Sequence, residues 1–196
     1  MTENPTTLVI CCGAVAREIV GIVHENGWNH IHVECLPANM HNDPDSLPEA
    51  VRAKIRAGHE RYENVLVLYS DCGTGGQMAE MLEEEGVEGI GGAHCYEVFA
   101  GSERFREIIS EEAGCFFVTD FLARHFDKLV YRGLGLDRYP KLRDTYFGNY
   151  KKLVYLAQSD DDELKARAKA AAESIGLEFE IRFTGYGDFE KFLSSR

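Results

Sequence analysis

Short apolar runs alternate with helical patterns along most of the chain. The runs are rich in β-branched and aromatic residues and are bounded by turn residues, which predicts strands at 7–12, 31–36, 64–69, 87–90, 115–119, 152–157 and 177–183. Between them, apolar residues spaced by three or four predict helices at 14–27, 47–58, 77–85, 95–112, 121–131, 137–147, 159–176 and 189–193. Strands that alternate with helices in this way indicate βαβ units.

This alternation predicts an α/β fold, a three-layer sandwich around a mostly parallel, Rossmann-like sheet. The run at 64–69 (NVLVLY) is almost uniformly apolar, as expected of a strand that is covered on both faces of a parallel sheet. A chain of 196 residues with 44% hydrophobic content can bury one substantial core. We therefore expect a single domain over 1–196.

The net charge restricts the classes of partner. A formal charge of -12 and a pI near 5.0 disfavour phosphate backbones and anionic membrane surfaces. No apolar run approaches the roughly 20 residues of a membrane helix, and the opening residues, 1–5, lack the basic and apolar regions of a secretion signal. The sequence predicts a cytoplasmic protein that binds a small molecule and neither nucleic acid nor membrane.

The predicted topology sorts the cysteines into two groups. In open parallel sheets, ligands bind at the carboxyl ends of the strands, where the loops converge. Cys115 begins its strand, so we expect it at the other edge, in the core. The residues that follow the first four strands, and that should share one edge, are Cys11, Cys12, Cys35, Cys72, His94 and Cys95.

Thiols and an imidazole that converge on one edge are suitable ligands for zinc. Cys72 and Cys95 are the first candidates, His94 and Cys35 come next, and Cys12 is a substitute. Iron, or no metal, is the alternative, because the chain has neither a C-x-x-C nor an H-E-x-x-H motif. Two other interpretations stay open: small buried side chains at loop ends, and Cys72 as a nucleophile in its glycine-rich turn.

Two loops add polar groups to the same edge. His41 and Asp71 are candidates for proton transfer, although His41 is equally suited to be a ligand or a loop cap. Glycines in the DCGTGG turn would let backbone amides approach a phosphate or carboxylate, and a simple tight turn explains the pattern equally well. The candidate anion-binding residues of this turn are Gly73, Thr74, Gly75 and Gly76. Thr119 and Asp120, after the fifth strand, are further candidates, with helix capping as the alternative.

Several longer segments resemble a known family. They are CCGA, PANMHNDP, YSDCGTGG, HCYEVFAG, FFVTDF and FGNYKKLVY, and they span the chain from Leu8 to about Tyr155. Together they resemble an uncharacterised family of domain-of-unknown-function proteins, often encoded beside corrinoid-dependent methyltransferases and their corrinoid proteins in methylotrophic bacteria and methanogens. The resemblance implies a setting in one-carbon metabolism, where a zinc-bound thiolate would suit methyl transfer.

Two functions follow from these observations. The first is a metal-dependent transferase or hydrolase, with a zinc-thiolate centre, that acts on a small anionic or methylated metabolite. The second is a non-enzymatic accessory protein that binds a corrinoid, a one-carbon carrier, a corrinoid protein or a methyltransferase. The chain lacks a D-x-H-x-x-G pattern, which counts against direct cobalt ligation.

Overall fold

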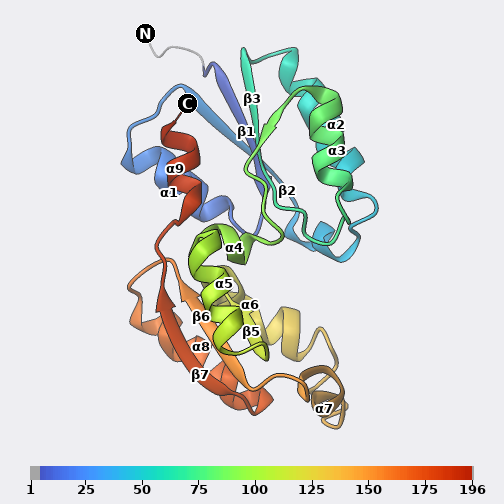
Figure 1. Ribbon diagram of the computed structural model, residues 1–196, viewed down its shortest axis with the longest axis vertical. Helices are drawn as coiled ribbons and strands as arrows, with labels where there is room; N and C mark the ends of the chain where they lie inside the picture. The colour runs from blue at the N-terminus through green and yellow to red at the C-terminus, as the bar shows by residue number, and fades with distance from the viewer. Residues whose placement is uncertain (1–4, 196) are drawn as a thin grey trace. The chain divides into compact units, whose positions relative to one another are not determined.

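The chain forms two compact units, each built around its own parallel sheet (Figure 1). The computed structural model describes residues 5–195. The prediction that residues 1–5 carry no secretion signal therefore falls mostly outside the described residues. Unit 1 comprises residues up to Val98 together with those from Tyr186 onward, and unit 2 comprises Phe99–Gly185. The predicted α/β class with parallel strands is confirmed, but the strands divide between two sheets. The assignment of 1–196 to one domain stays a prediction.

Unit 1 contains a four-stranded sheet in the order β2-β1-β3-β4, and every neighbouring pair is parallel. Its central strand, β1, lies between β2 and β3, with Cys11 opposite both Cys35 and Leu68. The elements of unit 1 are β1 (Thr7–Cys12), α1 (Ala16–Glu25), β2 (Ile31–Leu36), η1 (Ala38–Asn42), α2 (Leu47–His59), β3 (Asn64–Leu68), α3 (Gln77–Glu85), β4 (Glu88–Gly89) and α9 (Asp188–Ser194).

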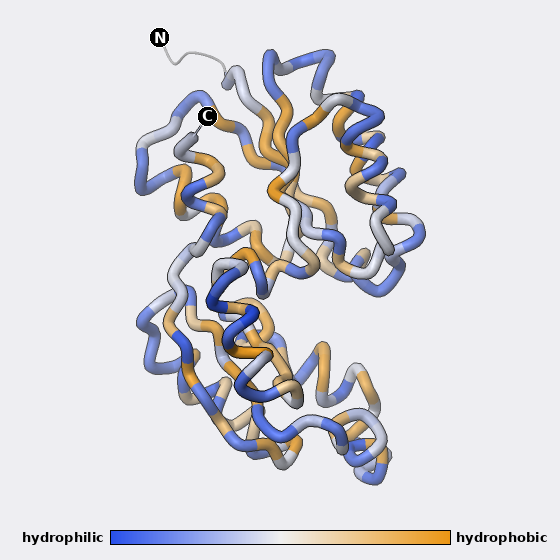
Figure 2. The backbone as a smooth tube through the Cα atoms, viewed as in Figure 1, coloured by the Kyte–Doolittle hydropathy of each residue, from blue (hydrophilic) through white to orange (hydrophobic). Residues whose placement is uncertain are grey.

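Helices cover both faces of this sheet. α2 and α3 lie over one face, where Leu8, Ile10 and Val67 meet Val51 and Met81 in a buried cluster. The other face carries α1 and α9. Figure 2 shows the hydrophobic residues concentrated along the strands and on the inner sides of the helices. Burial of these side chains contributes roughly 25 cal/mol per Å² of apolar surface removed from water, which stabilises the packing of the helices on the sheet.

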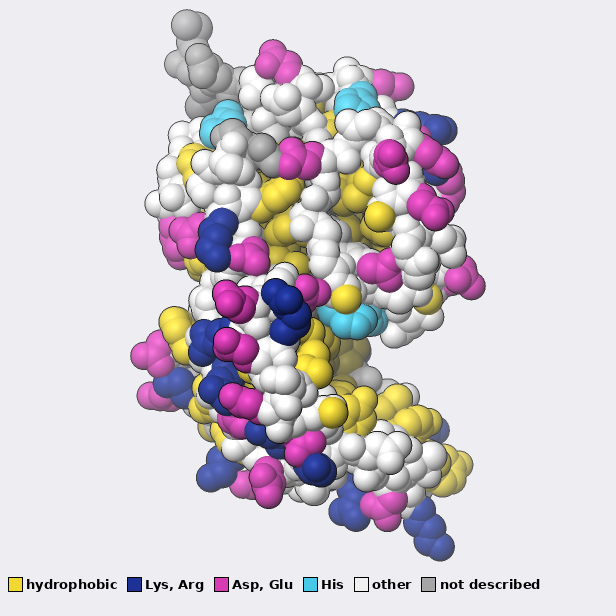
Figure 3. Space-filling view, in the orientation of Figure 1, with side chains coloured by type: hydrophobic (Ala, Val, Ile, Leu, Met, Phe, Trp, Pro, Cys, Tyr) yellow, Lys and Arg dark blue, Asp and Glu magenta, His cyan; other side chains and the backbone are white. Residues whose placement is uncertain are grey.

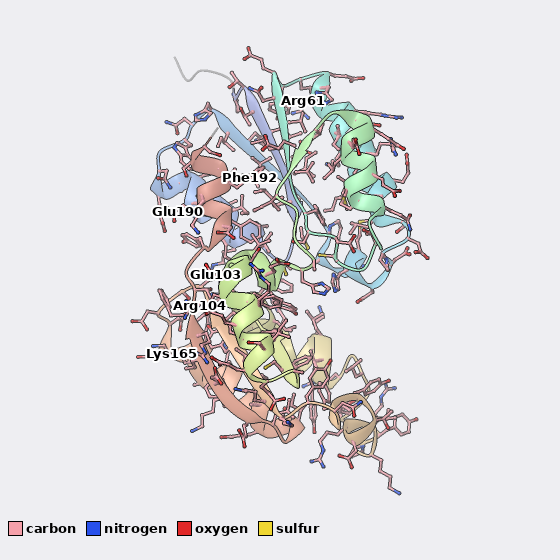
Figure 4. All side chains as sticks on the ribbon, viewed as in Figure 1. Arg61, Glu103, Arg104, Lys165, Glu190 and Phe192 are labelled. Atoms are coloured by element: carbon pink, nitrogen blue, oxygen red, sulfur yellow. The ribbon has the colours of Figure 1, made fainter. Side chains whose placement is uncertain are left out.

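Unit 2 has a three-stranded parallel sheet in the order β5-β6-β7. Phe116 packs with the cluster beneath α6 and α8, whereas the ring of Phe117 lies 5.0 Å from that of Phe105 on α5, as expected of alternating side chains in a strand. Arg104 of α5 donates to the Phe183 carbonyl at 3.2 Å (Figure 4). The elements are α5 (Ser102–Glu111), β5 (Cys115–Val118), α6 (Asp120–Phe126), η2 (Asp127–Tyr131), α7 (Leu142–Phe147), β6 (Lys152–Ala157), α8 (Asp162–Ile175) and β7 (Glu178–Phe183).

Four predicted helices differ from the structure. The helix expected over 95–112 is divided at Gly101, whose φ of +80° favours glycine, so that α4 (Cys95–Ala100) precedes α5. The helix over 121–131 ends as the π-helical turn η2, and only Leu142–Phe147 of 137–147 is helical. The helix expected over 159–176 begins at Asp162, and Asp161 caps it by accepting hydrogen bonds from two of its first amides. No helix within residues 5–195 has the length and apolar composition needed to cross a bilayer.

A buried carboxylate joins the strand ends of unit 2. The side chain of Asp120 is only 1% exposed and accepts hydrogen bonds from Tyr155 Oη at 2.6 Å, Ser159 Oγ at 2.5 Å and the Gln158 amide at 3.0 Å. The Asp120 amide in turn donates to the Gln158 side chain at 2.7 Å. Asp120 therefore ties the end of β5 to the end of β6.

We expect Asp120→Ala to lower the free energy of unfolding of the protein by about 3 kcal/mol or more, because it leaves several buried donors without an acceptor. Urea denaturation followed by circular dichroism would measure the change. Asp127→Ala is the matched control, since Asp127 pairs with Arg132 at the surface and its loss should cost less than about 1 kcal/mol. Equal losses in the two variants would contradict this role for Asp120.

Candidate functional site

The carboxyl edge of the unit 1 sheet gathers the predicted site residues. Because β1 and β3 are neighbours and both lie parallel to β2 and β4, the segments that follow the strands leave from one edge. After β1 the chain continues to β2 on one side of the sheet, and after β3 it continues to β4 on the other side. Open α/β sheets bind ligands at the carboxyl ends of two such neighbouring strands. Cys12 lies at the end of β1 and Cys72 follows β3, so these two cysteines border that position.

Backbone hydrogen bonds hold Cys72 next to the segment that follows β4. The Asp71 amide donates to the Gly92 carbonyl at 2.9 Å, and the Cys72 amide donates to the Ala93 carbonyl at 3.0 Å. These bonds continue the pairing of β3 with β4 beyond the end of both strands. Cys72 is thereby held beside the segment that contains His94 and Cys95, although these residues are far from it in the sequence.

The Cys12, Cys72 and Cys95 thiols influence one another's ionisation. Burial and, after it, the neighbouring Cys12 raise the pKa of Cys72 to about 11, against the opposing effect of the Cys95 amide. Burial also raises the pKa of Cys95, followed by repulsion from Cys72 and Cys12. Burial raises the pKa of Cys12, against a hydrogen bond from the Ala14 amide at 3.4 Å. The three side chains thus form one electrostatic group, which we call the thiol cluster.

Cys72 has an unusual backbone conformation. Its φ is +51°, and among the described residues it is the one non-glycine residue with a positive φ. Such a conformation costs about 1 kcal/mol or more for a residue with a Cβ, and residues of this kind concentrate at functional sites. The sharp turn between β3 and α3 resembles the strand–turn–helix geometry that presents a nucleophile at the top of a sheet.

Asp71 closes the glycine-rich turn on itself. Its carboxylate accepts hydrogen bonds from the amides of Gly73 and Gly75 at 3.1 Å each, from the Gly76 amide at 2.6 Å and from the Thr74 hydroxyl at 3.0 Å. Desolvation opposes ionisation of Asp71, but these donors together outweigh it and lower its pKa. The amides predicted to bind an anion already bind Asp71, so a ligand anion would have to displace this carboxylate.

The same hydrogen bonds bear on the predicted proton-transfer role of Asp71. A carboxylate that is held ionised by several donors is a weak base, so the structure favours a role for Asp71 in positioning the turn. The Thr74 hydroxyl extends this role, because it also accepts from the Met78 amide at 3.3 Å in the first turn of α3. Proton transfer by Asp71, and anion binding by Gly73, Thr74, Gly75 and Gly76, stay predictions.

His41 and His94 lie near each other at the same edge. His41 belongs to η1, which follows β2, and both imidazoles are exposed. Desolvation lowers the pKa of His41, and repulsion from His94 lowers it further. A lowered pKa keeps His41 neutral at pH 7, the state in which an imidazole accepts a proton or binds a metal ion.

Cys35 lies on the face of the sheet opposite to Cys12, although it contributes to the raised pKa of Cys12. It is opposite Cys11 in the parallel pairing of β1 and β2, so the two side chains lie on one face of the sheet and Cys12 on the other. Cys35 is exposed, and Cys11 is fully buried. Cys115 is buried at the start of β5 in unit 2, where its Sγ donates to the Glu112 carbonyl at 2.9 Å.

The predicted ligands approach one another in pairs. Within residues 5–195, no three side chains of histidine, cysteine, aspartate or glutamate are grouped so that they could hold a metal ion as they stand. Cys72 is coupled to Cys95 and Cys12, and His41 to His94. The donor types suit zinc, and binding would require at least one side chain to turn toward the others.

Tyr69 and Ser70 follow β3 directly and were not among the predicted site residues. Both residues are 3% exposed. The Tyr69 phenol shares a side-chain hydrogen bond with Cys12, and the Ser70 hydroxyl has no partner among the described residues. Burial raises the pKa of Tyr69, as do the nearby Cys12 and Cys11 sulfurs, which places its phenol beside the thiol cluster. In the sequence, these residues form the polar end of an otherwise apolar strand. Strands without a functional role often end in the same way, so this pattern does not identify a site.

We expect alkylation by iodoacetamide to separate Cys72 from Cys35. Cys35 is exposed and should be modified rapidly at pH 8. The Cys72 thiolate forms only as the pH approaches about 11, so its modification should be slow at pH 7 and increase about tenfold per pH unit up to pH 10. Peptide mass spectrometry would give both rates. A Cys72 rate that levels off below pH 8 would contradict the raised pKa.

Comparisons with known proteins give a family and a distant structural likeness. A family model described as "Protein of unknown function (DUF1638)" matches residues 35–193. No curated protein matches the chain. Among solved structures, ornithine carbamoyltransferase from Pyrococcus furiosus is similar at 15% identity and a TM-score of 0.30, over 92% of this chain and 54% of that one. The chain therefore spans about half the length of that enzyme.

Proposed function

This chain belongs to the DUF1638 family, and we propose that unit 1 carries a zinc-thiolate centre that acts on a small metabolite. In this proposal Cys72 and Cys95 are the ligands, and either Cys12 or His94 supplies a third donor. Cys35 is left out because its side chain lies on the other face of the sheet. A bound zinc ion would supply Lewis acidity and keep its thiol ligands deprotonated.

The observation that carries this proposal is the backbone pairing of the segment that follows β3 with the segment that follows β4. Two backbone hydrogen bonds fix the Cys72 segment beside the Cys95 segment, and each thiol raises the pKa of the next. Thiols that are held close together in a desolvated position are protonated at pH 7. A soft divalent cation would replace those protons and offset the repulsion between the resulting thiolates, which is why metal affinity at such sites depends on pH.

Other residues of the same edge have supporting roles in this proposal. His41 is neutral at pH 7 and exposed, so it would accept or deliver the proton of the reaction. Asp71 is a positioning residue, because its carboxylate holds the turn that carries Cys72. The reaction would be a transfer or a hydrolysis. The family resemblance implies a substrate from corrinoid-linked one-carbon metabolism, either anionic or methylated.

One observation favours a second function, an accessory protein that binds a corrinoid, a one-carbon carrier or a corrinoid protein. Without a cation the thiols are protonated at neutral pH, and the Asp71 carboxylate is already occupied by donors of its own turn. Such an edge would bind a ligand without supplying a nucleophile or a carboxylate base.

We expect the protein, purified without added metal and without a metal-binding tag, to contain about one equivalent of zinc by elemental analysis. Cys72→Ser and Cys95→Ser should each reduce the content to near zero, because each removes one of the two proposed ligands. Cys12→Ser and His94→Ala identify the third donor, since only one of them should reduce the content strongly.

Cys115→Ser is the matched control for these variants. It also removes one buried thiol, but in unit 2, and should retain the full metal content. Circular dichroism would confirm that each variant is folded. Folded protein that takes up no zinc, iron or cobalt even when dialysed against the ion would overturn the metal centre and leave the binding function.

A further inference from the structure

The strand β7 forms an open edge of the unit 2 sheet. Among the described strands it pairs only with β6, and Figure 1 shows it at the margin of the sheet. Directly after β7, the Thr184 amide donates to the Ala157 carbonyl of β6 at 2.9 Å. Because backbone groups alternate in direction along a strand, the N–H and C=O groups of Phe179, Ile181 and Phe183 point away from β6. These groups are available to a further strand.

Apolar side chains of the unit 2 core continue to this edge and reach solvent there. Val118, Tyr155 and Ile181 lie side by side on three neighbouring strands. Val118 and Tyr155 are fully buried, whereas Ile181 is 41% exposed. In the next row, Ala157 is buried and Phe183 is 58% exposed. An edge strand that exposes large apolar side chains is a surface on which another strand can pair.

The other face of β7 is charged. Glu180 and Arg182 lie on that face and form an ion pair, and Glu180 also accepts from Lys152 while Arg182 contacts Glu111 on α5. Figure 3 shows acidic and basic side chains intermixed at the surface over α5 and β7, with hydrophobic side chains beside them. Charges on an edge strand usually oppose pairing, because like charges directly opposite one another are destabilising.

The order of residues in β7 is complementary to itself in one antiparallel register. When two copies pair about a two-fold axis at Ile181, Phe179 lies opposite Phe183 of the second copy, and Glu180 lies opposite its Arg182. The Glu180 and Arg182 positions are then non-hydrogen-bonded pairs, in which cross-strand side chains approach most closely.

The same charges disfavour the neighbouring registers. A shift of two residues in one direction places Glu180 opposite Glu180 of the second copy, and a shift in the other direction places Arg182 opposite Arg182. Both arrangements juxtapose like charges. A shift of one residue would move the apolar side chains to the charged face. The charge pattern of β7 therefore selects the register with Ile181 at the two-fold axis.

We propose that two copies of this chain pair through β7, antiparallel and about a two-fold axis at Ile181, and so join their unit 2 sheets into one continuous sheet. The backbone groups of Phe179, Ile181 and Phe183 exchange hydrogen bonds across the axis. Arg104 already donates to the Phe183 carbonyl, but a carbonyl oxygen accepts two hydrogen bonds, so this contact is compatible with the pairing. The interface lies in unit 2 and is independent of the zinc centre proposed for unit 1.

Sedimentation equilibrium of the full chain tests the association. A single pair of edge strands is at the small end of specific interfaces, so the dimer should dissociate on dilution with a Kd on the order of 10 µM. Ile181→Lys places two like charges at the axis and should raise the Kd at least about tenfold. Leu129→Lys is the matched control, because Leu129 is 44% exposed in η2, away from β7, and its replacement should leave the Kd unchanged.

Disulfide cross-linking tests the register. In Ile181→Cys the two introduced residues form a hydrogen-bonded pair with Cα atoms about 5.5 Å apart, within the range of a disulfide. Mild oxidation should therefore produce a covalent dimer joined through residue 181, which peptide mass spectrometry identifies. Phe183→Cys is the matched control. Its introduced residues are displaced along the strands by roughly 13 Å and should not join, although Phe183 is more exposed than Ile181.

Three results would each overturn the proposal. The first is a wild-type protein that stays monomeric from about 2 to about 200 µM, a range that brackets the expected Kd. The second is a dimer that Ile181→Lys does not weaken, with circular dichroism showing that the variant is folded. The third is cross-linking of Phe183→Cys as readily as of Ile181→Cys, which would mean that the copies meet in another register or through another surface.

Discussion

The Asp71 carboxylate is the group on which the geometry of the candidate site depends. It gathers three backbone amides and one hydroxyl of its own turn, and this set of hydrogen bonds allows the chain to reverse between β3 and α3 within a few residues. The glycines of the turn supply the positive φ values that the reversal requires, and Cys72 is held in the same region of φ despite its Cβ. Without the carboxylate, the amides of Gly73, Gly75 and Gly76 would lose their acceptor, and the Cys72 segment would be held only by its backbone hydrogen bonds to Gly92 and Ala93.

This arrangement also explains why the thiols interact. The fixed turn presents the Asp71 and Cys72 amides to the carbonyls of Gly92 and Ala93, and so brings two distant segments into register. Cysteines that end or follow neighbouring strands then lie close together, and desolvation and the repulsion that their thiolates would exert on one another keep them protonated. Because the amides of the glycine-rich turn bind Asp71, the turn presents occupied donors rather than the free anion site that its sequence suggests when it is considered alone.

Much of this organisation was predictable from the sequence, because it follows from local pattern. The strands at Thr7–Cys12, Ile31–Leu36 and Lys152–Ala157 have the predicted bounds, since continuous apolar runs between turn residues leave little choice. The partition into two sheets was not predictable, because periodicity does not specify which strands pair. The position of Cys35 depended on register, which places it with Cys11 on one face. The hydrogen bond from the Gly76 amide to Asp71 was not predictable either, because it depends on the three-dimensional path of the turn.

The two sheets use buried polar groups in contrasting ways, and the contrast bears on function. In unit 2, Asp120 is satisfied by Tyr155, Ser159 and the Gln158 amide, so its network joins two strands and leaves no polar group open for a ligand. In unit 1, Asp71 is equally satisfied, and the buried Tyr69 phenol near it shares a side-chain hydrogen bond with Cys12. The two edges differ in their thiols and imidazoles: Cys12, Cys72 and His41 end or follow strands of the unit 1 sheet, whereas the segments that directly follow β5, β6 and β7 contain no cysteine or histidine. For this reason the proposed function is assigned to the edge of the unit 1 sheet.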